Sequence, residues 1–78
     1  ETEFTFQEQR DYETIEGEIA SLEEKAERLE AETASAATDF VKLNQLTKEK
    51  EEVEALLEQK MERWMYLEDL AARIEAEN

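Results

Sequence analysis

Almost all the side chains that could do chemistry in this sequence are carboxylates. The 78 residues include 23 Asp and Glu but no Cys and no His, so the sequence offers no thiol, no zinc-binding pattern and no imidazole to move a proton near neutral pH. The single glycine, Gly17, excludes a glycine-rich loop around a phosphate, because such a loop needs several residues without a Cβ. Carboxylate pairs can act as acid and base only in a pocket that shifts their pKa, and every Glu here lies in a repetitive helical pattern. We therefore expect no catalytic site, no metal site and no cofactor in this chain.

The remaining candidates for chemistry are cations in the middle of the chain. Residues 1–24 hold nine acids and one base (−8), residues 25–50 hold five of each (0), and residues 51–78 hold nine acids and three bases (−6). A chain that folds back on itself brings its two acidic ends to one pole and its balanced middle to the other, which is the surface least repulsive to a polyanion. The candidate nucleic-acid contacts are the cations of that middle, namely Lys25, Arg28, Lys42, Lys48 and Lys50. The alternative is that these charges only form solvated helix faces.

The composition predicts that long helices position these residues. There is no proline, and Glu, Ala, Leu and Lys dominate, as in long helices and coiled coils. Thr5 and Glu8 have the spacing of a capping box, which marks a helix start. Apolar or small residues then recur with alternating spacings of three and four from Tyr12 to Ala36. The same spacing runs from Leu43 to Ile74, where Lys50 and Lys60 interrupt the apolar stripe. We predict helices over about 6–35 and 40–76, joined by a turn at about 36–39.

The two periodic stripes predict an all-α fold, an antiparallel two-helix coiled-coil hairpin. The register that gives the short turn pairs residues whose numbers add up to 79, such as Ile15 with Trp64; a slip of one heptad, to 72, is the alternative. Either Thr38 or Asp39 can cap the second helix. Met65 and Tyr66 lie off the stripe and could pack against Phe4 and Phe6 at the open end. The predicted core consists of Tyr12, Ile15, Ile19, Leu22, Leu29, Leu46, Val53, Leu57, Trp64 and Leu67.

The chain is so short that we expect at most one domain, covering residues 1–78. Its first residue is Glu1 rather than Met, which suggests a piece of a longer protein. The longest apolar stretch spans residues 64–67, far too short for a membrane span, so we expect no membrane contact. The oligomeric state expected for such a hairpin is a monomer or a weak homodimer that forms a four-helix bundle.

Two segments resemble a known family. Residues 4–10, FTFQEQR, and residues 61–68, MERWMYLE, are similar to the opening and closing segments of the C-terminal coiled-coil domain of Uup-like ABC-F ATPases. The neighbourhoods of Arg10 and of Arg63 with Trp64 carry most of the resemblance. Two features depart from the family: Gln7 replaces a basic residue, and the net charge of −14 is far more negative than a DNA-binding tail should have.

The resemblance implies a cytoplasmic parent protein with two ATP-binding cassettes, which would use ATP and Mg and act on ribosomes. This chain would be its non-catalytic tail. The tail would contact the ribosome, a nucleic acid, or the ATPase modules of its own parent chain. The main alternative is a structural or protein–protein coiled coil that binds no nucleic acid. A DNA-binding module is a third possibility, which the acidic charge disfavours.

Overall fold

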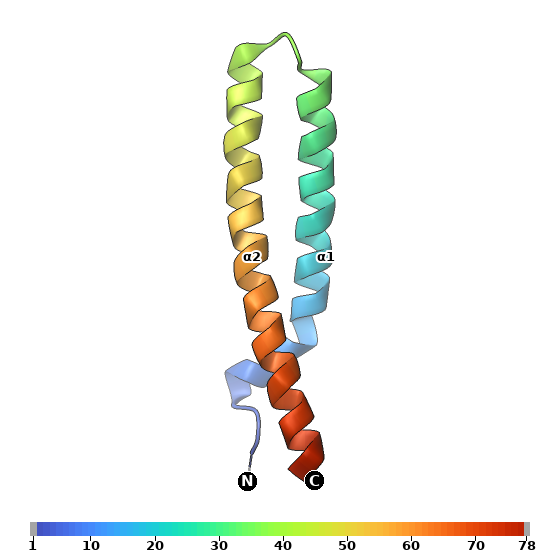
Figure 1. The fold of residues 1–78 in the computed structure, drawn as a ribbon, viewed down its shortest axis with the longest axis vertical. Helices are drawn as coiled ribbons and strands as arrows, with labels where there is room; N and C mark the ends of the chain where they lie inside the picture. The colour runs from blue at the N-terminus through green and yellow to red at the C-terminus, as the bar shows by residue number, and fades with distance from the viewer. Residues whose placement is uncertain (1, 78) are drawn as a thin grey trace.

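The computed structural model describes residues 2–77, which form two long helices joined by a tight turn. Helix α1 spans Phe6–Ser35 and helix α2 spans Phe40–Glu77. The helices run antiparallel side by side, and the two ends of the chain lie at the pole opposite the turn (Figure 1). The molecule measures 58 × 15 × 14 Å along its principal axes. The prediction of an all-α antiparallel hairpin is confirmed.

Polar caps fix where each helix starts. The Glu8 amide donates to the Thr5 hydroxyl (3.2 Å), and the Thr5 amide donates to the Glu8 carboxylate (2.9 Å). The predicted capping box is therefore confirmed, and it satisfies amides that have no partner within the helix. At the start of α2 the Asp39 carboxylate accepts from the Lys42 amide at 3.1 Å, so Asp39 is the cap of this helix.

The turn between the helices is held by backbone hydrogen bonds and needs no glycine. The Ala36 amide donates to the carbonyls of Glu32 and Thr33, and the Asp39 amide donates to the Ala36 carbonyl at 2.9 Å. No residue in the described part of the chain has a positive φ. A chain reversal within residues 36–39 is what the register with numbers adding up to 79 requires.

The helices bury two separate apolar clusters. The tip cluster, next to the turn, consists of Leu29, Ala36, Leu46 and Val53, with Leu22, Ala26 and Leu43 packed against it. The open-end cluster consists of Ile15, Ile19 and Leu67, with Phe4, Tyr12, Leu57 and Trp64 packed against it. Because no polar or charged side chain within residues 2–77 is buried, apolar burial is the main force that holds the helices together.

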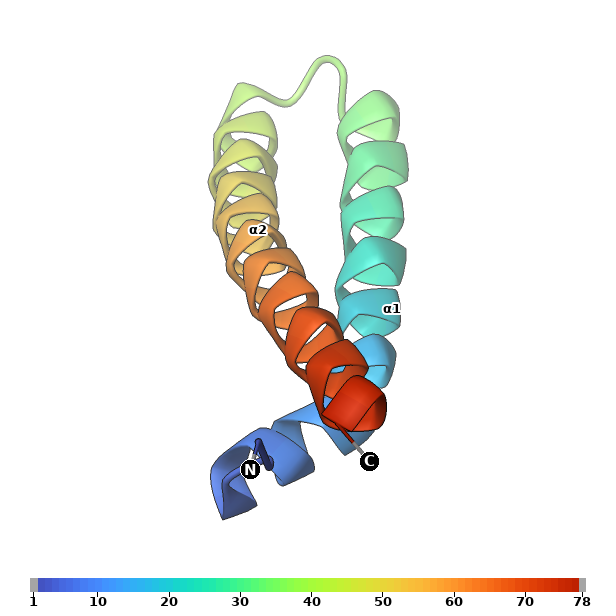
Figure 2. The ribbon, with the colours of Figure 1, turned by 60° about the horizontal axis from the view of Figure 1, so that its bottom comes forward.

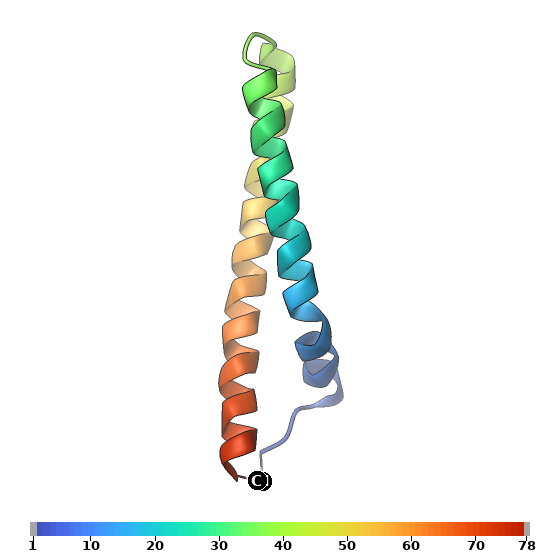
Figure 3. The same ribbon diagram turned by 90° about the vertical axis from the view of Figure 1, so that its right-hand side faces the viewer.

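The start of α1 leaves the axis of the hairpin. Figures 1 and 2 show its first turns bending away and crossing α2. The Thr14 hydroxyl donates to the Arg10 carbonyl at 3.2 Å, a contact that often accompanies a bend in a helix. Seen from the side in Figure 3, the segment before α1 returns toward the end of α2, where the Thr2 amide donates to the Glu77 carboxylate at 3.0 Å. Side chains near this crossing therefore have different partners from those expected for a straight α1.

Candidate functional site

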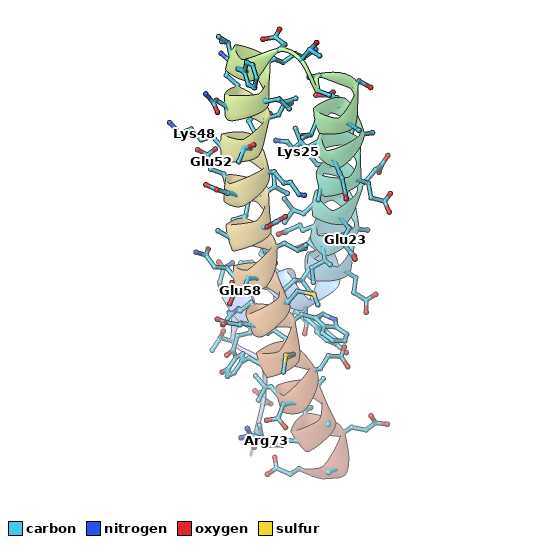
Figure 4. The ribbon with its side chains drawn as sticks, turned by 45° about the horizontal axis from the view of Figure 1, so that its top comes forward. Glu23, Lys25, Lys48, Glu52, Glu58 and Arg73 are labelled. Carbon is cyan, nitrogen blue, oxygen red and sulfur yellow. The ribbon has the colours of Figure 1, made fainter. Side chains whose placement is uncertain are left out.

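The predicted nucleic-acid contacts lie in the tip half, which we define as residues 25–50. Four of these cations are exposed, and Lys50 is half-buried and lies 3.9 Å from the Glu54 carboxylate. Figure 4 shows Lys25 on α1 and Lys48 on α2, with Glu52 beside Lys48 along the helix. The structure therefore brings the cations to one half of the rod but does not gather them in a pocket. Such an arrangement can contact a broad anionic surface, and it offers no enclosed site for a small ligand.

In the open half, which we define as residues 2–24 and 51–77, most cations are engaged by carboxylates. Lys60 forms an ion pair with Glu18, and Arg63 pairs with Asp11 through two nitrogens at 3.1 and 3.3 Å. Arg73 pairs with Asp69 one turn earlier on the same helix. For the four exposed cations of the tip half, the described residues provide no ion-pair partner within 4.0 Å. These four are Lys25, Arg28, Lys42 and Lys48, and they are the ones positioned to meet an outside anion.

The contacts between the helices at the open end form a polar clamp. It consists of three pairs, in which α2 side chains reach carboxylates of α1: Lys60 with Glu18, Arg63 with Asp11, and Tyr66 with Glu8. The Tyr66 hydroxyl donates to the Glu8 carboxylate at 2.6 Å, and the Arg63 guanidinium lies 5.2 Å from the centre of the Tyr66 ring. The clamp therefore fastens the bent start of α1 onto α2.

The pKa shifts within the clamp favour the charge states that form its contacts. The pKa of Glu8 is lowered, first by the Thr5 amide and then by the Tyr66 hydroxyl. The pKa of Asp11 is lowered by the Gln7 amide group and by Arg63, and that of Glu18 by Lys60 and by the Thr14 hydroxyl. The pKa of Tyr66 is raised by its hydrogen bond to Glu8. Each shift strengthens the ordinary charge state at neutral pH, whereas a general acid or base needs a pKa near the working pH.

The aromatic residues of the open end are only partly covered. The Trp64 ring packs against the open-end cluster, but its buried Nε1 has no hydrogen-bond partner among the described residues. It lines a shallow groove of about 290 Å³ together with Glu16, Ile19 and Met61. A second groove, of about 470 Å³, passes Gly17 and Lys60. With no charged side chain of residues 2–77 buried, neither groove offers the desolvated acid or base that an enzyme site needs.

Comparison with known proteins then identifies the chain. A family profile described as the ABC transporter C-terminal domain matches residues 3–69. This chain belongs to that family. It is also 38% identical over 72 residues, 92% of this chain, to an "Uncharacterized ABC transporter ATP-binding protein YfmR" of Bacillus subtilis (strain 168). No solved structure gives a significant match. The resemblance to the C-terminal domain of an ABC-F-like ATPase is therefore confirmed.

The chain corresponds to only a small part of this relative. The matched region covers 11% of the Bacillus protein, so an ATP-binding function indicated by that protein's name concerns a chain much longer than the C-terminal domain. Within residues 2–77 no helix is long and apolar enough to cross a membrane, and no three residues among His, Cys, Asp and Glu gather to hold a metal ion.

The predicted core residues of the C-terminal domain all lie along the interface between α1 and α2. Six of them are buried: Ile15, Ile19, Leu29, Leu46, Val53 and Leu67. The other four are half-buried and pack against one of the two clusters: Tyr12, Leu22, Leu57 and Trp64. The side chains of Lys50 and Lys60, which interrupt the stripe of α2, are each 36% exposed. This exposure is consistent with an aliphatic stem on the interface and an ammonium group at its edge.

The structure shows two features of the open end that the heptad pattern did not predict. Leu70 is buried (8% exposed) although it lies outside the stripe. It lies on one face of α2 with Arg63 and Tyr66, because helical residues three, four and seven apart share a face, and the clamp shows that α1 reaches this face. Met65 and Tyr66, which we expected to pack against Phe4 and Phe6, are both exposed. Met65 stays 64% exposed, and Tyr66 instead binds Glu8.

Proposed function

We propose that this chain is the non-catalytic C-terminal coiled-coil domain of a cytoplasmic ABC-F ATPase, and that its tip half contacts the ribosome. The ATP and Mg of the parent protein would bind in its ATPase modules, outside this domain. The observation that carries the proposal is the division of charge along the rod. The tip half has a net charge of zero and four exposed cations, whereas the ends of the chain hold the whole charge of −14.

This division gives the rod a preferred orientation toward a polyanion. Ribosomal RNA repels carboxylates and attracts lysine and arginine side chains, because each cation that meets a phosphate releases condensed counterions. An approach with the open half first would bring the acidic ends and the clamp against the RNA. An approach with the tip half first brings Lys25, Arg28, Lys42 and Lys48, so the electrostatic field favours this orientation.

The test is a charge reversal in the full parent protein. A variant with Lys42→Glu and Lys48→Glu should bind purified ribosomes at least about tenfold more weakly, and the slope of log K against log salt should fall by about one for each lysine that no longer meets a phosphate. The matched control is Arg10→Glu with Arg73→Glu, because it changes the net charge equally at exposed arginines of the open half. Equal binding by the wild type and the tip variant would contradict the proposal.

A second candidate function is a coiled coil that only contacts proteins, such as the ATPase modules of its own parent or a second copy. The observation that favours it is that the tip cations do not converge (Figure 4) and that residues 25–50 as a whole carry no net positive charge. Sedimentation of the isolated domain tests the second copy, because a monomer at high micromolar concentration excludes strong self-association. A gel assay near physiological salt tests DNA binding, for which the acidic charge predicts no measurable affinity.

A further inference from the structure

The apex of the hairpin exposes two neighbouring hydrophobic side chains. Phe40 and Val41, the first two residues of α2, are 77% and 72% exposed. The stripe that α2 buries begins further along the chain, with Leu43 and Leu46. Neither of the two exposed residues belongs to a core cluster. These two side chains form an apolar knob next to the turn, and the turn lies at one end of a rod 58 Å long (Figure 1).

The surroundings of this knob are unusual for the chain. Charged residues make up 41% of the sequence, yet residues 33–47 contain only Asp39 and Lys42. The carboxylate of Asp39 already accepts the Lys42 amide as the helix cap. A partner that covers Phe40 and Val41 thus has few charges to desolvate, and removing a charge from water without a partner is the main cost of burying a surface.

The knob is also held in place before any partner arrives. Ala36 is 7% exposed in the tip cluster, the Asp39 amide donates to the Ala36 carbonyl, and the Leu43 amide donates to the Asp39 carbonyl. These contacts fix the backbone on both sides of the turn. A partner that binds there has little backbone entropy to remove, which is the advantage of a preorganised anchor.

Phe6, at the other end of the rod, is equally exposed but differs in its surroundings. It is 79% exposed, and the Arg10 guanidinium lies 5.8 Å from the centre of its ring. Its half of the chain carries the excess of carboxylates. Phe6 thus provides an internal control, the same side chain with the same exposure but in a strongly charged setting.

We propose that Phe40 and Val41 insert into an apolar, weakly charged pocket on a protein partner at the ribosome. The proposal rests on the ribosome contact proposed above and specifies what the apex of the hairpin binds there. A protein pocket fits better than a nucleic-acid base, because Lys42 is the only cation in residues 33–47 and Val41 has no ring to stack. Single-stranded nucleic-acid sites, in contrast, combine stacking rings with a cationic groove.

The experiment compares Phe40 variants of the full parent protein in binding to purified ribosomes. Phe40→Ala should weaken binding about tenfold or more, as expected for an aromatic anchor. Phe40→Leu should stay within about threefold of the wild type, because an apolar pocket accepts another large apolar side chain. The matched control Phe6→Ala should bind like the wild type, and circular dichroism of each variant should show unchanged helix content, because both residues are exposed.

Each other outcome overturns part of this picture. Equal binding by Phe40→Ala and the wild type, together with weaker binding by the tip charge-reversal variant, would contradict the insertion of the knob but support the ribosome contact. Loss with Phe40→Leu but not with Phe40→Trp would show base stacking in place of a protein pocket. A change in the sedimentation of the parent with Phe40→Ala would point to a second copy as the occupant. No ribosome binding by the wild type would end both proposals.

Discussion

The tip half and the open half of the hairpin are stabilised in different ways. In the tip half the helices meet through apolar side chains, the net charge of residues 25–50 is zero, and four cations stay exposed. In the open half the helices bury Leu67 completely and add a polar clamp, and both of the ion pairs that join α1 to α2 in the described residues lie there. Three of the cations outside the tip half, Lys60, Arg63 and Arg73, are thus paired with carboxylates of the chain itself.

The difference follows from where the negative charge lies. Residues 1–24 and 51–78 carry −8 and −6, and bringing them together at one pole costs free energy through repulsion between like charges. Ion pairs at the interface offset part of this cost locally, although exposed pairs contribute little individually. The tip half has no such repulsion to offset. Its cations are left for an outside partner, which is the physical link between the stability of the rod and its proposed role.

The largest expected effect is on the packing of the open half. Leu67 is 0% exposed, and Leu67→Ala should lower the free energy of unfolding by about 2–5 kcal/mol, through reduced burial and the cavity that remains. This approaches the whole stability expected of a domain this small. Urea unfolding followed by circular dichroism measures the change. The control is Leu56→Ala on the same helix, at a residue 44% exposed, and a similar loss from both variants would refute the packing described.

The next effect compares the caps at the two ends of the rod. Thr5→Ala should cost about 0.5–2 kcal/mol, because it removes one hydrogen bond of a reciprocal pair and leaves the Glu8 amide without its partner. Asp39→Ala at the tip should cost at least as much, since it removes the bond from the Lys42 amide and also a carboxylate that the N-terminus of a helix favours. The melting temperatures of the two variants give the order of these costs. Thr47→Ala, at an exposed position inside α2, should cost nothing.

A smaller effect, of opposite sign, is expected in α1 at Gly17. A Cβ built at Gly17 meets no atom within 4 Å, so Gly17→Ala should stabilise the hairpin by roughly 0.5–1 kcal/mol through helix propensity alone. The reverse change nearby, Ala20→Gly at an exposed position of the same helix, should destabilise by a similar amount. Destabilisation by Gly17→Ala in thermal unfolding would show instead that the bend of α1 depends on this glycine.

The tip half could be predicted from the sequence because its structure follows from local signals. The spacing of Leu29, Leu46 and Val53 indicates which faces meet, and the small and hydroxyl-bearing residues before Phe40 indicate the turn. The choice between Thr38 and Asp39 as cap needed the structure, since both residue types accept amide hydrogen bonds. A heptad pattern predicts the packing well where both helices are straight, as they are in the tip half (Figure 1).

The open half could be predicted only in part, because the bend of α1 is a tertiary feature. A heptad stripe assumes two straight helices, and it therefore misses Leu70 and the partners of Arg63 and Tyr66. The sequence does show that Arg63, Tyr66 and Leu70 share a face of α2, but it does not show that α1 crosses this face. That information comes from the directions of the first turns of α1, which a one-dimensional pattern does not contain.

The smallest effect concerns the polar clamp, which pH should release from the open half alone. The folded pKa of Asp11 is lowered from 3.8, chiefly by the Gln7 amide group and then by Arg63. Its contribution is therefore present above the unfolded pKa and is lost as pH falls through the folded one. The melting temperature of the wild type should exceed that of Asp11→Asn at pH 7, and this gap should close below about pH 4.

The gap between the two melting temperatures isolates the clamp from the other carboxylates. Their protonation stabilises both proteins in the same pH range by relieving repulsion, so only the difference between the proteins reports on Asp11. Glu27→Gln removes one negative charge from α1 in the tip half and should show no such gap. A gap between wild type and Asp11→Asn that persisted at pH 2 would mean that Asp11 acts through packing, and the contrast between an apolar tip half and a clamped open half would then no longer hold.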